Sequence, residues 1–114
     1  MDKRLLWVLL LPLISHAQTG EKAVEVVLPV KKVHEECMEL IPGQTLKFQY
    51  EANAELDFNL HYHHGKEVTM PMSGKYSNYS NTYVATQKND FCLMWQNKSG
   101  GPVKLQTTYQ IIVP

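Results

Sequence analysis

Apolar and polar residues alternate with a period of two through most of this chain, from Val24 onward. Successive side chains of a β-strand point to opposite faces, so this alternation predicts strands with one buried and one solvated face. The clearest example runs from Leu56 to Tyr62, where apolar residues occupy every second position. No stretch of this region has the period of an amphipathic helix, and the sequence therefore predicts an all-β fold.

Turn signals divide the region into about eight expected strands. These are expected at residues 24–30, 35–40, 46–50, 56–62, 66–70, 82–86, 91–96 and 103–113. The segment Met72 to Tyr79 is rich in Ser, Gly and Tyr, which is typical of a loop. Strands of this number and spacing predict one antiparallel β-sandwich domain over residues 24–114. The expected core consists of alternating apolar residues: Leu46, Phe48, Leu56, Phe58, Leu60, Phe91, Leu93, Trp95, Leu105 and Ile111.

The first 17 residues are typical of a secretion signal. A short basic start precedes an apolar run from Leu5 to Ile14, which is shorter than the roughly 20 residues needed to span a bilayer. Ser15-His16-Ala17 then places small residues before a cleavage point at Gln18. An uncleaved anchor or a buried helix is the alternative. We expect cleavage, a flexible mature N-terminus over residues 18–23 and no membrane span in the mature chain.

The sequence contains two cysteines, Cys37 and Cys92. An even pair of cysteines in an exported chain predicts a disulfide, since exported proteins enter an oxidising compartment. A bridge that closes a loop of about 55 residues stabilises a fold by roughly 4 kcal/mol in the chain-entropy model. The alternative is a pair of buried free thiols.

The charge of the chain argues against nucleic acid as a partner. It has 11 basic and 11 acidic residues, and its one arginine, Arg4, lies in the expected signal. Arginine is the residue that binds phosphates through a bidentate fork, and nucleic-acid binding needs a basic surface. We therefore expect neither nucleic acid nor an anionic membrane surface to be bound.

From Cys37 onward the sequence resembles the GOLD (Golgi dynamics) domain. The similar segments are Glu36-Cys37-Met38-Glu39, Ile41-Pro42-Gly43-Gln44-Thr45-Leu46, Phe48-Gln49-Tyr50, Leu56-Asp57-Phe58-Asn59-Leu60, Asp90-Phe91-Cys92-Leu93, Trp95-Gln96-Asn97-Lys98-Ser99 and the last strand, Val103 to Val113. Their order is similar to that in the lumenal domain of the transmembrane cargo receptors that cycle between endoplasmic reticulum and Golgi. The resemblance implies a β-sandwich, a bridge between Cys37 and Cys92, and a role in protein–protein contact. Those receptors continue into a coiled coil, a membrane helix and a coat-binding tail, whereas this sequence ends at Pro114, so the resemblance does not carry coat recruitment over to this chain.

His61 and His63 are candidate metal ligands. On a strand they point to the same side about 7 Å apart, a spacing at which two imidazoles can share one metal ion. Asp57 or His34 is the candidate third ligand. Alternation places this pair on the face opposite Phe58, so the alternative is an ordinary solvated strand face.

A second group of residues is a candidate interaction surface. It consists of Met70, Met72, Tyr76, Tyr79 and Tyr83, in and next to the expected loop. Aromatic and methionine side chains on a loop suit contact with a protein, although they could also cover one end of the sandwich.

Two glycosylation sequons, Asn78-Tyr79-Ser80 and Asn97-Lys98-Ser99, also occur, and these matter only in a eukaryotic secretory pathway.

The sequence indicates no catalytic residues and no cofactor. It has no Gly-x-Ser-x-Gly elbow and no glycine-rich phosphate loop, and the neighbouring Glu35 and Glu36 would face opposite sides of a strand. The function that we expect is therefore that of a non-catalytic protein-interaction module, secreted or periplasmic, whose partner is another protein. The alternative is an extracytoplasmic metal-binding protein that uses the His61/His63 strand.

Overall fold

The structure, a computed structural model, describes residues 20–114, and this part of the chain is all-β and contains no helix. Its strands are β1 (Lys22–Leu28), β2 (Val33–Leu40), β3 (Thr45–His64), β4 (Glu67–Val84), β5 (Asn89–Gln96) and β6 (Val103–Ile112). The predicted secretion signal lies outside the described residues. Among the described residues there is no helix long and apolar enough to cross a membrane. β1 includes Lys22 and Ala23, which we had expected in a flexible N-terminus.

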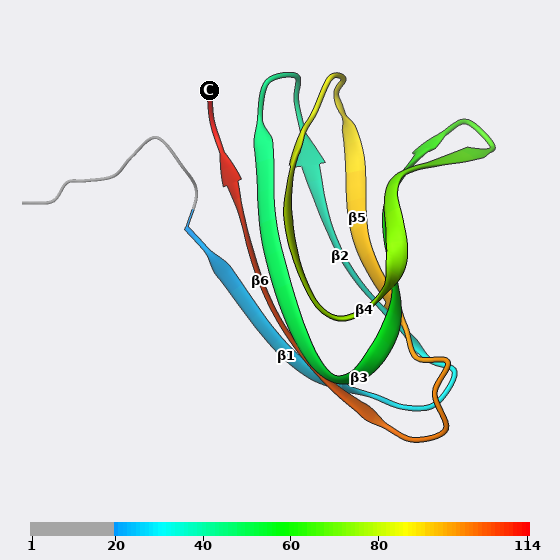
Figure 1. Cartoon of the computed structure of the whole chain (residues 1–114). Coiled ribbons are helices and arrows are strands. Elements are labelled where there is room, and N and C mark those ends of the chain that lie inside the picture. The colour runs from blue at the N-terminus through cyan, green and yellow to red at the C-terminus, as the bar shows by residue number, and fades with distance from the viewer. Residues whose placement is uncertain (1–19) are drawn as a thin grey trace, which may run out of the picture.

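The six strands form one antiparallel sheet in the order β1-β6-β3-β5-β2, with β4 paired along β3 (Figure 1). The first part of β3, Thr45 to Ala52, pairs with β6, and its last part, Asp57 to Tyr62, pairs with β5. Between these parts the register with β4 shifts, and both long strands bend. The first half of the sheet consists of β1, β6, residues 45–52 of β3 and the part of β4 that pairs with them. The second half consists of β2, β5 and the rest of β3 and β4.

The bent sheet encloses an aromatic core between its two halves. Phe58 from the second half lies with its ring centroid 5.5 Å from those of Phe48 and Tyr50 in the first half. Trp95 is fully buried and meets Tyr50 edge-on at 5.7 Å. Of the ten core residues expected from alternation, all but Ile111 are buried, and Ile111 is partly buried against the same cluster. The buried apolar residues outside that expected list are Leu28, Leu40, Tyr50, Ala85, Cys92, Val103 and Tyr109.

The expected number of strands was wrong, because two sets of expected elements merge into β3 and β4. β3 continues through Asn53-Ala54-Glu55, where no glycine or proline stops it. The expected loop Met72 to Tyr79 lies entirely within β4, and this segment pairs with residues 50–60 of β3. Its tyrosines gain burial against the core, and such tertiary packing outweighs a loop-like composition.

The predicted disulfide is present and joins the edge strand β2 to β5. Cys37 and Cys92 are direct cross-strand partners, and their sulfur atoms are bonded. A disulfide is typical of a protein that works in an oxidising, extracytoplasmic environment. The turns expected at Pro42-Gly43 and at Gly65 are also confirmed, since both glycines have positive φ, 92° and 63°.

Candidate functional site

A long trough lies on the outer face of the first half of the sheet. It consists of three adjoining hollows of about 820, 360 and 240 Å³. The floor of the largest is the backbone at Val24, Thr107, Tyr50 and Tyr79, which are neighbours in register and whose side chains belong to the opposite face. Because the hollows follow β3 from Lys47 to Asn53, the trough is about 20 Å long.

Two cross-strand rows of outward-pointing side chains line the largest hollow. One row is Ala23–Thr108–Gln49–Ser80 and the other is Glu25–Gln106–Glu51–Asn78. Most of these side chains are amides or hydroxyls, which both donate and accept hydrogen bonds. The charge of Glu25 is balanced by Lys104, whose Nζ lies 3.0 Å from its carboxylate. The trough therefore offers hydrogen-bonding groups on a surface of low net charge.

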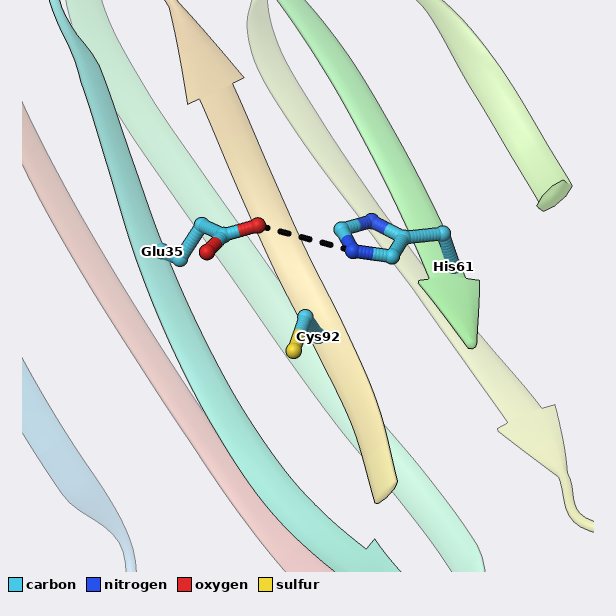
Figure 2. A group of neighbouring side chains, drawn as sticks. All are labelled: Glu35, His61 and Cys92. Atoms are coloured by element: carbon cyan, nitrogen blue, oxygen red, sulfur yellow. Dashed lines mark ion pairs between the residues drawn. The ribbon is translucent and has the colours of Figure 1, made fainter. Parts of the chain in front are cut away.

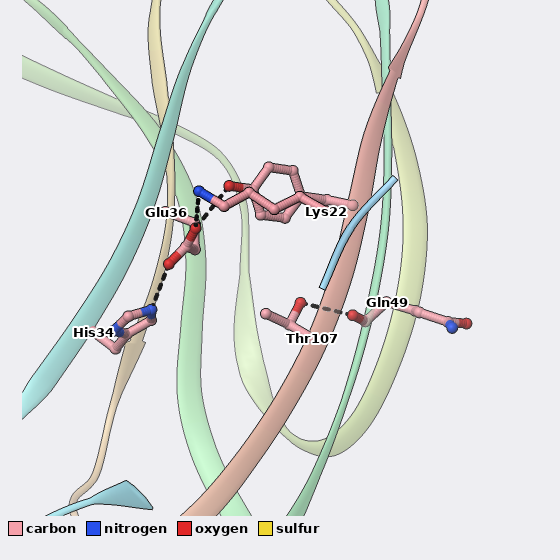
Figure 3. Close-up of polar contacts among 6 residues, drawn as sticks. Lys22, His34, Glu36, Gln49 and Thr107 are labelled. Atoms are coloured by element: carbon pink, nitrogen blue, oxygen red, sulfur yellow. Dashed lines mark hydrogen bonds and ion pairs between the residues drawn. The ribbon is translucent and has the colours of Figure 1, made fainter. Parts of the chain in front are cut away.

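The backbone beneath the trough is fixed by a buried side chain. Thr107 is 2% exposed, and its Oγ1 donates a hydrogen bond of 2.8 Å to the carbonyl oxygen of Gln49 on the neighbouring strand (Figure 3). This bond ties β6 to β3 at the centre of the trough.

The histidine strand is placed differently from the expectation. His61 and His63 share the outer face of the second half, with ring centroids 5.4 Å apart, but His61 is only 5% exposed, so the expectation of a solvated face was wrong for it. Neighbouring side chains on β2, β3 and β5 cover it. The candidate third ligands are not brought to this pair. Asp57 lies about 13 Å back along the strand and pairs with Lys98 at 2.8 Å, and His34 faces the core side of β2, against Trp95.

Glu35 and Cys92, rather than Asp57 or His34, lie next to His61 (Figure 2). His61 Nε2 is 3.5 Å from the Glu35 carboxylate, and Nδ1 is 2.7 Å from the Asn59 side-chain oxygen. One carboxylate oxygen, the imidazole nitrogen and the Cys92 sulfur all lie within 4.8 Å of one another. Sequence reasoning missed this group because it depends on the register of three strands.

A largely buried carboxylate, that of Glu36, links the open edges of the two halves (Figure 3). It accepts a hydrogen bond of 2.7 Å from the Tyr109 hydroxyl and contacts His34 Nε2 at 2.6 Å and Lys22 Nζ at 3.5 Å. Burial alone raises the pKa of this carboxyl, but the bonds from Tyr109 and His34 and the charge of Lys22 outweigh it and hold the pKa below its ordinary value. Burial, followed by the bond to Glu36, raises the pKa of Tyr109. The group therefore crosslinks β1 and β6 to β2.

The predicted interaction residues lie on β4 rather than on a loop. Met72, Tyr76, Tyr79 and Tyr83 are partly buried against the core, and Met70 is exposed. This arrangement agrees with the alternative that most of them cover the core.

The two sequons differ in accessibility. Asn78 is exposed in the wall of the trough, whereas Asn97 is fully buried. Its amide nitrogen donates to the carbonyls of Leu28 and Gly101, both at 2.9 Å. A glycan on Asn97 is incompatible with this packing, so of the two sequons only Asn78 is accessible in the folded chain.

Comparisons with known proteins give little guidance. No family model and no curated protein matches the sequence. Among solved structures, the chain is similar to a de novo designed double-stranded beta-helix determined by solution NMR. The two share 15% sequence identity and a TM-score of 0.44, over 77% of this chain and 97% of the designed one. Similarity at this level carries no argument about function.

Proposed function

We propose that this protein is a non-catalytic, extracytoplasmic interaction module that binds an extended segment of another protein in the trough. The observation that carries the proposal is the hollow of about 820 Å³ across β1, β6, β3 and β4. Its volume lies within the range of about 300–1,000 Å³ that is usual for pockets that bind small molecules. The adjoining hollows lengthen it along β3.

The dimensions and chemistry of the trough suit a polypeptide. A length of about 20 Å accommodates roughly six residues of extended chain. The amides of Gln49, Gln106 and Asn78 can each pair with both the N–H and the C=O groups of a peptide backbone. The large aromatic rings beneath the trough, those of Phe48 and Tyr50, point into the core, so they are not positioned as a stacking platform for sugars.

The GOLD-like β-sandwich and secretion are parts of the same proposal. The bent sheet with an aromatic core between its halves supports the sandwich. The Cys37–Cys92 bridge supports an exported protein. The non-catalytic character is supported by Glu36, whose two oxygens are already held by Tyr109, His34 and Lys22, so this carboxylate is engaged in structure rather than poised for proton transfer.

Site-specific photo-crosslinking tests the proposal. A benzophenone amino acid replaces Gln49 in the trough or, as a control, Glu39, which is exposed on the outer face of β2. In the native compartment we expect adducts from position 49 only, and mass spectrometry should map them to an extended segment of one protein. A synthetic copy of that segment should bind the parent, and bind Gln49→Arg/Gln106→Arg at least ten times more weakly. Equal labelling from positions 49 and 39 would contradict the proposal.

A metal-binding role of the histidine strand is the second candidate. The observation in its favour is that His61 and His63 lie on one face with their rings 5.4 Å apart. Zinc and copper should be titrated into the oxidised parent and into His61→Ala/His63→Ala, with the fold of the double variant checked by NMR because His61 is buried. A tight site that is lost in the folded double variant would favour this role, and the lack of saturable binding to the parent would count against it.

A further inference from the structure

One row of residues crosses three strands on the outer face of the second half. His61 on β3 is the cross-strand partner of Cys92 on β5, and Cys92 is the partner of Cys37 on β2. Glu35 lies two residues before Cys37, so its side chain emerges on the same face (Figure 2). The register of the three strands therefore brings an imidazole, a carboxylate and a sulfur atom, all possible metal ligands, close together.

One ring nitrogen of His61 is held by Asn59, and the other is presented to Glu35. The side-chain oxygen of Asn59 can only accept a hydrogen bond, so the His61 Nδ1 that lies 2.7 Å from it carries the hydrogen. In the neutral imidazole, Nε2 is then a bare lone pair, and it faces a carboxylate oxygen of Glu35 at 3.5 Å. Two acceptors face each other, and a cation between them satisfies both. A hydrogen bond on the second ring nitrogen is the usual support of a metal-bound histidine.

The spacing of these donors suits zinc. Bonds of about 2.0–2.3 Å to N, O and S place tetrahedral ligands about 3.4–3.8 Å from one another. The Nε2–carboxylate separation of 3.5 Å already agrees with this. The widest separation within the group of three is at most 4.8 Å, so a side-chain movement of about 1 Å brings the Cys92 sulfur into range.

In the disulfide, the Cys92 sulfur is not available to a metal ion, since a metal binds the thiolate and not a sulfur bonded to another sulfur. We propose that reduction of the Cys37–Cys92 disulfide opens a zinc site formed by His61 Nε2, the Glu35 carboxylate and Cys92 Sγ, with water as the fourth ligand. Two equivalents of a thiol break the S–S bond and become a disulfide, while Cys37 and Cys92 each gain one hydrogen. Zinc then displaces the proton of the Cys92 thiol. Cys37 is exposed, so a reductant reaches the bridge from solvent.

Titration of zinc into oxidised protein and into protein reduced with a phosphine tests the proposal, with cobalt as a spectroscopic probe of a metal–thiolate bond. The reduced protein should bind one zinc per chain at least 100 times more tightly than the oxidised protein. His61→Ala and Glu35→Gln should each weaken this binding at least tenfold, and Asn59→Ala about tenfold. Glu39→Gln, a matched change on the same face of β2, should leave it unchanged.

A pair of serine variants separates zinc binding from loss of the bridge. Both lack the disulfide, but Cys37→Ser keeps the Cys92 thiol and Cys92→Ser does not. Zinc should raise the melting temperature of Cys37→Ser without any reductant, and should not raise that of Cys92→Ser. If both variants are unfolded without metal, zinc should induce folding of Cys37→Ser only. Equal zinc affinity of oxidised and reduced protein, or an equal response of the two serine variants, would overturn the proposal.

Discussion

Replacement of Phe58 by alanine tests the way in which the two halves of the sheet are joined. Phe58 is 2% exposed, and its ring lies 5.5 Å from those of Phe48, Tyr50 and Tyr79 and 5.9 Å from that of Trp95. A buried Phe→Ala change costs about 3–5 kcal/mol of unfolding free energy. Because four rings surround this side chain, and aromatic pairs contribute beyond their buried area, we expect a value near the upper end.

The loss is large for a domain of this size. The roughly 95 described residues imply a total stability of about 5–14 kcal/mol, and 1 kcal/mol moves the melting temperature of such a domain by about 4–8 °C. Thermal unfolding of oxidised Phe58→Ala, followed by circular dichroism, should therefore show a melting temperature at least about 12 °C below that of the parent. Urea unfolding should show the matching loss of unfolding free energy. Val27→Ala is the control, since Val27 is 63% exposed and should change stability by no more than about 0.5 kcal/mol. A cost below about 1 kcal/mol for Phe58→Ala would refute the enclosed aromatic core.

Three further predictions concern polar residues. The pKa of Glu36 in the folded protein lies below its ordinary value of 4.5, so the carboxylate contributes its full stabilisation above pH 4.5 and loses it as the pH falls through the folded-state pKa. The parent should therefore be more stable than Glu36→Gln near pH 7. Melts at acid pH should show this difference in stability shrinking below about pH 4. Asn97→Ala leaves the Leu28 and Gly101 carbonyls without their donor, so chemical denaturation should show a loss of about 2–4 kcal/mol, whereas a loss within 0.5 kcal/mol would contradict the buried network. In a glycosylating host, peptide mapping of the folded protein should find glycan on Asn78 and none on Asn97.

The class of fold could be predicted because side-chain alternation is a local property. Leu56, Phe58 and Leu60 were assigned to the core from their spacing alone, and all three are buried. The length of β4 could not be predicted in this way. Its Ser, Asn and Gly residues have the composition of a loop, and only pairing with β3, together with burial of Tyr76 and Tyr79 on the core, makes the segment a strand.

The sites depend even more on long-range register. His61 was expected to be solvated because it alternates with Phe58 and Leu60, but neighbouring side chains on β2, β3 and β5 cover it. Gln49 and Gln106 were seen only as polar positions of two separate strands, and the pairing of β3 with β6 brings them together in the trough. No local pattern in the sequence encodes that pairing.

The most direct measurement of the proposed binding role is an NMR titration of the oxidised protein with the segment identified by crosslinking. The side-chain amide signals report on the site itself, because Gln49, Gln106 and Asn78 line the trough and Gln96 on the outer face of the second half serves as an internal control. The proposal predicts large, saturable shifts of the three trough signals and little change at Gln96. Saturable shifts at Gln96 with unchanged signals from the trough residues would contradict it.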